Sequence, residues 1–449
     1  MRMEDMILIS VDDHIVEPPD CFTSHIAAKY KDQAPKVITL ENGQERWVLE
    51  GKLRATVGSS AVAGRSREER HLEPANFSHI RKGCYDADAR VDDQNANGVL
   101  ASTNFSTFAG FAGEQFLRGE DMDLMHACVQ AYNDWHLEDW AGSHPGRFIP
   151  VTFAPLWDAD LAVKEIRRTA KKGTKAFCFP ENSCNFGLPS VHSDYWDPVF
   201  KECCDHDLVV CIHIGTGGGF RYPSLDSPAA VGITTMNITL ADVTADLLYS
   251  PLMKKFPNLK FALSEGYMGW MPFFKERCDF VQEFHGFWTG IDFGDMKPSE
   301  VIRKHFLLCF TEDPIGVKAR HDIGIEMITW ECDYPHADST WPVSPERLWK
   351  TLERLPKDEV DLMTHKNAMR YFNFDPFKHI KPQDATVGAL RALATHVDVT
   401  PKSDVGGFKP SRDLKGVVTY RDMMELAKAM DLGQLSRGKE AAPEGAARG

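Results

Sequence analysis

The stretch that decides the fold is Met327-Ile328-Thr329-Trp330-Glu331-Cys332-Asp333-Tyr334-Pro335-His336. Its apolar first half is typical of a buried strand, and Asp333 and His336 follow at the point where that strand leaves the core. A buried carboxylate needs an ion pair, hydrogen bonds or a metal ion, because burial of an isolated charge is costly. Taken alone, Asp333 is interpreted equally well as a cap of the next turn or as a functional group.

A second apolar run near the N-terminus ends in the same way, in Ile7-Leu8-Ile9-Ser10-Val11-Asp12-Asp13-His14. Asp12 and His14 are two residues apart, so on an extended strand they point to the same side, with Asp13 on the other. An acid–histidine pair at the ends of two buried strands, at opposite ends of the chain, indicates more than a surface hydrogen bond. The pattern places two potential metal ligands on one face.

Composition limits the class of protein. A chain of 449 residues with 43% hydrophobic content fits one large barrel with insertions. The formal charge of −14 argues against nucleic acid or an anionic membrane as a partner. We expect a cytoplasmic protein with a small-molecule substrate, because no apolar run is long enough to cross a bilayer and the N-terminus lacks a signal-peptide pattern. The 11 cysteines contain no CxxC pair, which argues against a disulfide framework or a zinc finger.

Apolar runs recur along the chain and alternate with segments of helical periodicity. The strands are predicted at 7–11, 99–103, 148–154, 175–180, 208–215, 260–266, 305–310 and 327–332. The main helices are predicted at 121–141, 161–171, 194–206, 237–255 and 271–284. Eight alternating strands and helices predict a (β/α)8 TIM barrel over residues 1–375.

Two segments do not follow the barrel pattern. Residues 36–82 are predicted to be an inserted β element after the first strand, with a hairpin at Asn42-Gly43 between two β-prone runs. Residues 376–449 are predicted to be a C-terminal extension, with one more helix at 420–432. Its last part, from Leu435 onward, is rich in Ala, Gly and charge and is expected to be disordered.

In a (β/α)8 barrel the functional residues lie at the carboxyl ends of the strands. Polar residues end the first, fifth, sixth and eighth predicted strands, namely Asp12, His14, His213, Glu265 and Asp333. We therefore predict that these five side chains converge on a metal site. Glu181 follows the fourth strand and is a further candidate, although a solvated loop glutamate is the better interpretation. The loops at 104–116 and 215–235 are expected to shape the substrate pocket.

These motifs resemble the amidohydrolase superfamily, in the amidohydrolase-related branch that includes aminocarboxymuconate semialdehyde decarboxylase. The resemblance covers about residues 5–375 and rests on Asp12-Asp13-His14, His213, the segment 257–266, Cys332-Asp333-Tyr334-Pro335-His336 and Asn367-Ala368-Met369-Arg370. It implies that Asp12, His14, His213 and Asp333 bind a divalent metal. The sequence departs from the family pattern at Asp12, where relatives often have His or Glu, and at Glu265, where the decarboxylases have a histidine that assists catalysis.

Two histidines and three carboxylates suit one or two divalent ions (Zn, Fe or Mn), with Glu265 as a ligand of the second ion or as a base. The first hypothesis is hydrolysis of an amide, ester, lactone or thioester. In that mechanism Asp333 takes a proton from a metal-bound water and returns it to the leaving group, and His336 orients Asp333 or the substrate.

Three other functions remain open. The first is a non-oxidative decarboxylase of an aromatic or dienoic acid, with Phe220, Trp270 and Trp341 as aromatic side chains that hold a ring, although such residues are more often packing residues. A dinuclear iron oxygenase is less favoured. A degenerate barrel that serves as the structural partner of an active homologue belongs to a different class. We also expect a homo-oligomer, most simply a dimer.

Overall fold

The computed structural model describes residues 1–449 except 72, 218–221, 404, 408–415 and 426–449. The core of the described part is a series of parallel strands in chain order. The first sheet contains β1 (Ile9–Ser10), β5 (Ala101–Thr103) and β6 (Phe148–Ile149). The second contains β7 (Val151–Thr152), β8 (Ala176–Cys178), β9 (Val209–His213), β10 (Lys260–Ser264), β11 (Phe306–Phe310) and β12 (Ile328–Trp330).

Two junctions join these sheets into a barrel. Pro150 separates β6 from β7 within the predicted third strand, because proline has no N–H for the ladder. At the other junction the N–H of Val11 donates to the carbonyl of Trp330 at 3.2 Å, and the N–H of Asp333 donates to the carbonyl of Asp12 at 2.8 Å. The first and last motifs of the sequence therefore lie side by side, and the predicted TIM barrel is confirmed.

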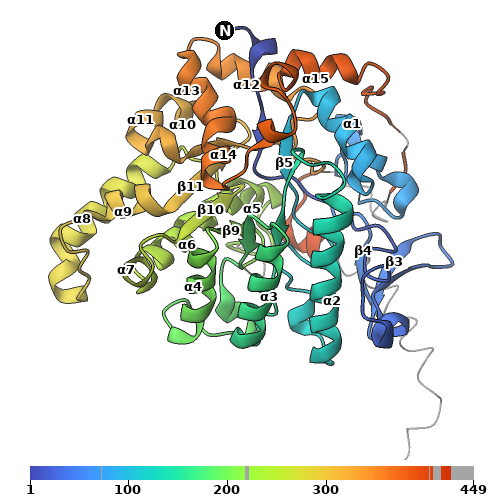
Figure 1. Cartoon of the computed structure of the whole chain (residues 1–449), viewed down its shortest axis with the longest axis horizontal. Helices are drawn as coiled ribbons and strands as arrows, with labels where there is room; N and C mark the ends of the chain where they lie inside the picture. Colours follow the sequence, from blue (N-terminus) through green and yellow to red (C-terminus); the bar gives the residue numbers. More distant parts are fainter. Residues whose placement is uncertain (72, 218–221, 404, 408–415, 426–449) are drawn as a thin grey trace, which may run out of the picture.

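Helices surround the strands on the outside, as Figure 1 shows. They are α1 (Ala87–Asn97), α2 (Met122–Trp135), α3 (Ala159–Lys171), α4 (Asp197–Asp205), α5 (Ala229–Thr235), α6 (Thr239–Leu248), α7 (Leu252–Lys255), α8 (Met271–Thr289), α9 (Pro298–His305), α10 (Pro314–Lys318), α11 (Arg320–Ile323), α12 (Ser344–Leu352), α13 (Lys357–Asp361) and α14 (Asn367–Tyr371). Aspartates cap the first three, since the carboxylates of Asp86, Asp121 and Asp158 accept hydrogen bonds from backbone N–H groups of the first turn. The helix predicted at 237–255 is divided into α6 and α7, with Pro251 directly before α7.

The strands are buried on both faces, as expected of a parallel sheet covered by helices. Every residue of β9 and β11 is buried. The cysteines within these strands, Cys211 and Cys309, are buried and unpaired, in agreement with the absence of a disulfide framework. Within the described residues, no helix is both long enough and apolar enough to span a bilayer.

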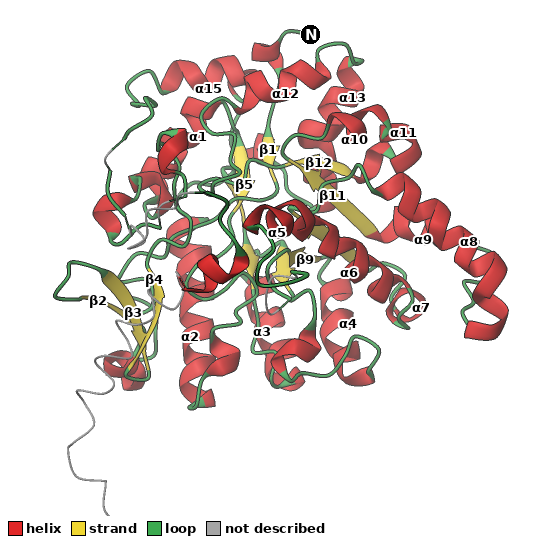
Figure 2. Ribbon diagram, turned by 180° about the vertical axis from the view of Figure 1, so that it is seen from behind, coloured by secondary structure: helices red, strands yellow, loops and turns green. Residues whose placement is uncertain are grey.

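The inserted β element is larger than the predicted hairpin. β2 (Lys36–Thr39) and β3 (Glu45–Leu49) pair in antiparallel fashion around Asn42-Gly43, as predicted. A third strand, β4 (Lys52–Thr56), pairs with β3 through a two-residue turn at Glu50 and Gly51, whose φ angles of 55° and 72° are those of a tight hairpin. Figure 2 shows this small sheet at the edge of the molecule beside α2.

The C-terminal extension contacts the rest of the chain at several places. Its helix α15 (Val387–Leu393) packs on α1, and the N–H of Val387 donates to the carbonyl of Met6 at 2.8 Å. Farther along, the N–H of Ala229 donates to the carbonyl of Val418, also at 2.8 Å. Residues 420–425 are helical. The rest of the helix predicted at 420–432 and the predicted disordered end lie outside the described residues.

Candidate metal centre

The barrel brings Asp12, His14 and His213 together at the carboxyl ends of β1 and β9. The Nε2 atoms of His14 and His213 lie 3.2 Å apart. The Asp12 carboxylate lies against both, with Oδ1 3.5 Å from Nε2 of His14 and Oδ2 3.3 Å from Nε2 of His213. One ligand atom from each of the three residues lies within 4.8 Å of the other two. This spacing is that of three side chains arranged around one cation.

A second group of side chains adjoins the first. Oδ1 of Asp333 lies 3.3 Å from Nε2 of His14 and 3.0 Å from Nδ1 of His336. The His336 ring lies over that of His14, with 3.8 Å between the ring centroids. On the other side, Oε2 of Glu265 lies 3.6 Å from Nε2 of His213. All six residues singled out from the sequence as ligands or catalytic groups therefore meet at one end of the barrel.

The surroundings of the Asp12 and Asp333 carboxylates indicate whether a metal ion fits between these side chains. Both side chains are completely buried, and within the described residues no donor makes a well-formed hydrogen bond to any of their four carboxylate oxygens. The two carboxylates face imidazole nitrogens at 3.0–3.5 Å, and a divalent cation would supply the positive charge that neutral imidazoles do not. The donor set of carboxylates and imidazoles suits Zn, Fe or Mn, so these residues fit the ion that the sequence predicts.

Titration of the site is dominated by burial. Burial, with the nearby charge of Glu265, raises the pKa of Asp12 well above its ordinary value, and burial beside Asp12 does the same for the pKa of Asp333. Burial beside Asp333 raises the pKa of Glu265 to about 8. Burial also lowers the pKa of His14 well below its ordinary value and that of His336 to about 4. Neutral imidazoles are the form that binds metal, and the carboxyl protons are the ones a metal displaces.

Two of the acidic residues have unusual backbone conformations. Glu265 and Asp333 both have a φ of 56°, in the left-handed region that side chains with a Cβ rarely adopt. Such a conformation costs on the order of 1–3 kcal/mol and persists only where the surrounding structure holds it. The N–H of Asp333 donates to Asp12, and the carbonyl of Glu265 accepts from Nδ2 of Asn237 at 2.6 Å. Positive φ at two residues of this cluster accords with a functional role.

Sequence reasoning missed a further acid, Glu331. Its side chain is completely buried, and Oε2 accepts a hydrogen bond from the N–H of Glu265 at 3.2 Å while Oε1 has no donor among the described residues. Burial beside Asp12 and Glu265 raises its pKa well above the ordinary value. The sequence spacing could have indicated Glu331, because it lies two residues before Asp333 and residues two apart on a strand point to the same side.

Asp13 has a different role from its neighbours, as its position on the other side of the strand predicted. Its Oδ1 accepts hydrogen bonds from Oγ of Ser10 at 2.9 Å and from the N–H of Tyr334 at 3.2 Å. The buried guanidinium of Arg90 lies 3.9 Å from Oδ2 of Asp13. Arg90 also donates to the carbonyl of His14. Asp13 thus ties the ends of β1 and β12 together.

Three further sets of candidates from the sequence remain. Glu181, expected to be a solvated loop glutamate, is half-buried, and its carboxylate accepts a hydrogen bond from Oγ1 of Thr239 at 2.6 Å. Trp270 and Trp341 donate to the backbone carbonyls of Gly266 and Asp93, which accounts for them as packing residues. Phe220 lies outside the described residues.

Phe111, in the loop at 104–116, contacts both histidines. Its ring centroid lies 4.3 Å from that of His213 and 4.6 Å from that of His14. Phe105 lies 5.1 Å from His213 in an edge-to-face arrangement. These two rings form an apolar wall beside the candidate cation position.

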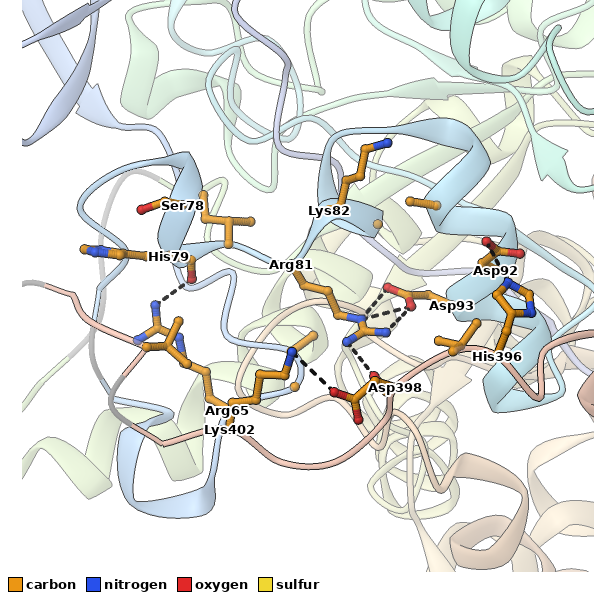
Figure 3. Close-up of a pocket in the computed structure, with 17 residues that line it drawn as sticks. Arg65, Ser78, His79, Arg81, Lys82, Asp92, Asp93, His396, Asp398 and Lys402 are labelled. Carbon is orange, nitrogen blue, oxygen red and sulfur yellow. Dashed lines mark hydrogen bonds and ion pairs between the residues drawn. The ribbon is translucent and has the colours of Figure 1, made fainter.

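A cavity of about 450 Å³ lies elsewhere, between the inserted segment, α1 and the C-terminal extension. Figure 3 shows its charged lining residues in pairs. Arg81 forms a bidentate pair with Asp93, Lys402 lies 3.4 Å from Asp398, and His396 lies 3.4 Å from Asp92. This cavity contains none of the predicted site residues, and its charges mostly neutralise one another.

Comparison with known proteins agrees with this description. A sequence model of the amidohydrolase family matches residues 85–374, which include His213, Glu265, Asp333 and His336. Among solved structures, an amidohydrolase from Mycobacterium avium subsp. paratuberculosis K-10 superposes with a TM-score of 0.62 at 18% identity, covering 82% of this chain and 99% of that one. The 5-carboxyvanillate decarboxylase of Sphingomonas paucimobilis gives a TM-score of 0.57 at 19% identity, with the same coverage.

A third similar structure holds a metal. The 5-carboxyvanillate decarboxylase of Novosphingobium aromaticivorans, in complex with manganese and 4-hydroxy-3-methoxy-5-nitrobenzoic acid, gives a TM-score of 0.59 at 15% identity and covers 83% of this chain and 99% of that one. At these identities the structural likeness establishes the fold alone. The sequence match, which extends over more than half of the chain, establishes more: this protein belongs to the amidohydrolase family.

Proposed function

We propose that this protein is a metal-dependent, non-oxidative decarboxylase of a small aromatic or dienoic carboxylic acid. The observation that carries the proposal is the buried Asp333 carboxyl, whose Oδ1 lies 3.3 Å from Nε2 of His14, beside the candidate cation position, and whose pKa burial raises well above its ordinary value. Two of the similar structures are decarboxylases of an aromatic acid, which also supports it. Hydrolysis, the first hypothesis from the sequence, becomes the second.

The chain's own groups account for the steps. Asp12, His14 and His213 would hold a divalent ion, which would supply the positive charge that binds the substrate carboxylate. The carbon–carbon bond to that carboxylate breaks, carbon dioxide leaves, and the electron pair remains on the substrate carbon. Asp333 delivers its proton to that carbon, so one carboxylate and one proton give carbon dioxide and the protonated product. His336, 3.0 Å from Asp333 and partly exposed, returns a proton from solvent to Asp333.

The apolar wall beside the histidines suits a flat substrate. The rings of Phe105 and Phe111 lie within 5.1 Å and 4.3 Å of the His213 ring. Aromatic and conjugated substrates pack favourably against such faces and edges. The ring of the substrate would then lie against Phe111, with its carboxylate toward His14 and His213.

Metal-dependent hydrolysis is the second candidate, and Glu265 favours it. In the decarboxylases that the sequence resembles, this position holds a histidine. A carboxylate 3.6 Å from His213 is suited to take a proton from water, and added negative charge disfavours an anionic substrate. The substrate would then be a neutral ester, lactone, amide or thioester.

One experiment separates the two. Protein loaded with Mn²⁺ is incubated with a panel of aromatic and dienoic acids and, in parallel, with aryl esters, lactones and thioesters. We expect release of carbon dioxide from at least one acid, at least about 100-fold slower in Asp333→Asn, because a positioned proton donor typically contributes 10²–10⁴-fold. Hydrolysis of a neutral substrate without decarboxylation of any acid would reject the proposal in favour of the second candidate.

Metal analysis tests the site itself and the alternative of an inactive structural partner. We expect stoichiometric divalent metal in the purified protein and its loss in Asp12→Ala. If Asp12→Ala and Asp333→Ala both leave the metal content unchanged, the assigned centre is wrong. Elemental analysis of protein purified without added metal also distinguishes one ion from two, and manganese from zinc or iron.

A further inference from the structure

Helix α8 makes little contact with the rest of the protein. Of its 19 residues, only Met271, Cys278 and Gly286 are buried. In Figures 1 and 2 it extends away from the barrel together with α9, at the edge of the molecule in both views. Most helices in proteins are stabilised by packing of an apolar face, and the outward side of α8 has no partner in the described part of this chain.

The outward side of α8 carries five exposed aromatic side chains, Phe273, Phe280, Phe284, Phe287 and Trp288. Their exposed fractions range from 41% for Phe280 to complete exposure for Phe287. Phe273, Phe280 and Phe287 are spaced seven residues apart, so they form one line along the helix. The rings of Phe280 and Phe284 stack with 4.3 Å between their centroids. We call this set of five residues the aromatic face of α8.

The area of the aromatic face is large for a monomer. Since a buried aromatic side chain covers about 150–250 Å², five side chains exposed to this degree present roughly 700 Å². The largest apolar patch on a typical monomer is about 300–600 Å². Two such faces in contact would bury roughly 1,400 Å², which lies in the range of about 1,200–2,000 Å² found for stable protein interfaces.

We propose that the aromatic face of α8 is the interface at which two copies of this chain form a dimer. A two-fold interface uses the same patch twice, so it must be complementary to itself. The exposed residues on and beside the aromatic face carry both signs of charge, with Arg277 on one side and Glu276 and Glu283 on the other. A second copy can therefore supply counter-charges. An anionic membrane is a poorer partner, because these two glutamates and the net charge of −14 oppose it.

The test uses the full-length protein at micromolar concentration in sedimentation velocity and light scattering. We expect the wild type to be a dimer. The double variant Phe280→Glu/Phe287→Glu should be a monomer, with dimerisation weakened at least about 100-fold, because it replaces two central aromatic side chains by like charges on both copies. The far-UV circular dichroism and metal content should not change, since both side chains are exposed. Leu393→Glu, which alters an exposed leucine on α15, is the matched control and should remain a dimer.

A wild type that is monomeric at micromolar concentration would overturn the proposal. So would a dimer that survives the double variant, because its interface would then lie elsewhere. Co-sedimentation of a monomeric wild type with phosphatidylcholine vesicles, lost in the double variant, would assign the aromatic face to a membrane surface instead.

Discussion

Arg90 determines the position of His14, although no motif of the sequence contains it. Its buried guanidinium donates to the carbonyl of Gly83 at 2.6 Å and to the carbonyl of His14, and it lies 4.4 Å from the centre of the Tyr334 ring. Tyr334 directly follows Asp333. One side chain therefore holds the backbone of His14 and contacts the ring of Tyr334, next to a candidate ligand on each side of the barrel seam.

Replacement of Arg90 tests this positioning role. In Arg90→Met we expect metal affinity to fall 10–100-fold, because His14 loses its backbone anchor. The free energy of unfolding should fall by about 3–5 kcal/mol, because Asp13 is left as an uncompensated buried charge. Metal competition with a chromophoric chelator and urea unfolding measure the two effects.

The double variant Arg90→Met/Asp13→Asn is the control. It removes both charges, so most of the stability should return while metal affinity stays low. If Arg90→Met binds metal as tightly as the wild type, Arg90 is only a structural residue.

Single residues could be predicted from the sequence where they belonged to a local pattern. Asp12, His14, His213, Glu265 and Asp333 each end an apolar run, so their position followed from strand geometry. Glu331 lies inside such a run and was taken as part of it. Arg90 gave no signal, because its partners His14 and Tyr334 are distant in the sequence and come close to it only in the folded barrel.

At the level of structural elements, the loop at 104–116 depends on one buried carboxylate. Glu17 accepts hydrogen bonds from the backbone N–H groups of Thr107, Phe108 and Ala109, the shortest at 2.8 Å. Its side chain is completely buried, and this burial raises its pKa to about 7 against the backbone hydrogen bonds that lower it. The same loop carries Phe111, which contacts the candidate metal centre.

The pKa of Glu17 predicts a dependence of stability on pH. Its folded-state pKa of about 7 exceeds the ordinary value of 4.5, so the unfolded chain loses this proton first as the pH rises. The contribution of Glu17 to the free energy of unfolding is therefore complete below pH 4.5 and falls by about 3 kcal/mol by pH 7. Glu17→Gln lacks this pH-dependent contribution to the free energy of unfolding, because the amide does not titrate.

The measurement is urea unfolding of both proteins between pH 4 and 7.5. The stability of Glu17→Gln relative to the wild type should rise by about 3 kcal/mol across this range. Glu68→Gln, at an exposed glutamate, is the control and should follow the wild type. A constant difference between Glu17→Gln and the wild type would contradict the assigned pKa.

Elements with strong periodicity were predicted well. All eight barrel strands follow from apolar runs, because strands buried on both faces contain few polar residues. The third strand is divided at Pro150, a proline visible in the sequence. β4 was missed because Lys52-Leu53-Arg54-Ala55-Thr56 has no apolar run and lies in a small sheet at the edge of the molecule.

At the level of the whole molecule, the candidate metal centre lies across the seam that closes the barrel. Asp12 and His14 follow the first strand and Asp333 follows the last, joined there by the hydrogen bond from the N–H of Asp333 to the carbonyl of Asp12. His213 comes from the opposite part of the barrel. A cation bound by these residues would therefore link segments more than 300 residues apart in the sequence.

This arrangement predicts that the metal raises the stability of the fold in addition to its role in the reaction. A ligand that binds only the folded state adds about 2.7 kcal/mol when its free concentration is 100 times its Kd. We therefore expect Mn²⁺ to raise the Tm of chelator-treated protein by several degrees at pH 7.5, measured by calorimetry with and without EDTA. The physical cause is that a divalent cation favours the ionised form of the buried Asp12 and Asp333 carboxyls, whose pKa values burial otherwise raises.

Asp12→Asn sharpens the test, because it separates the metal from the charge. Without metal, this variant should be more stable than the wild type by about 1–3 kcal/mol at pH 7.5. In the wild type, Asp12 is ionised in the unfolded chain at this pH, so folding must either bury the charge or bind a proton, and both cost free energy. The Asp12→Asn variant avoids this cost. With Mn²⁺ present, its Tm should not change, and the order of stability should reverse in favour of the wild type. Equal responses of both proteins to Mn²⁺ would show that the ion binds elsewhere.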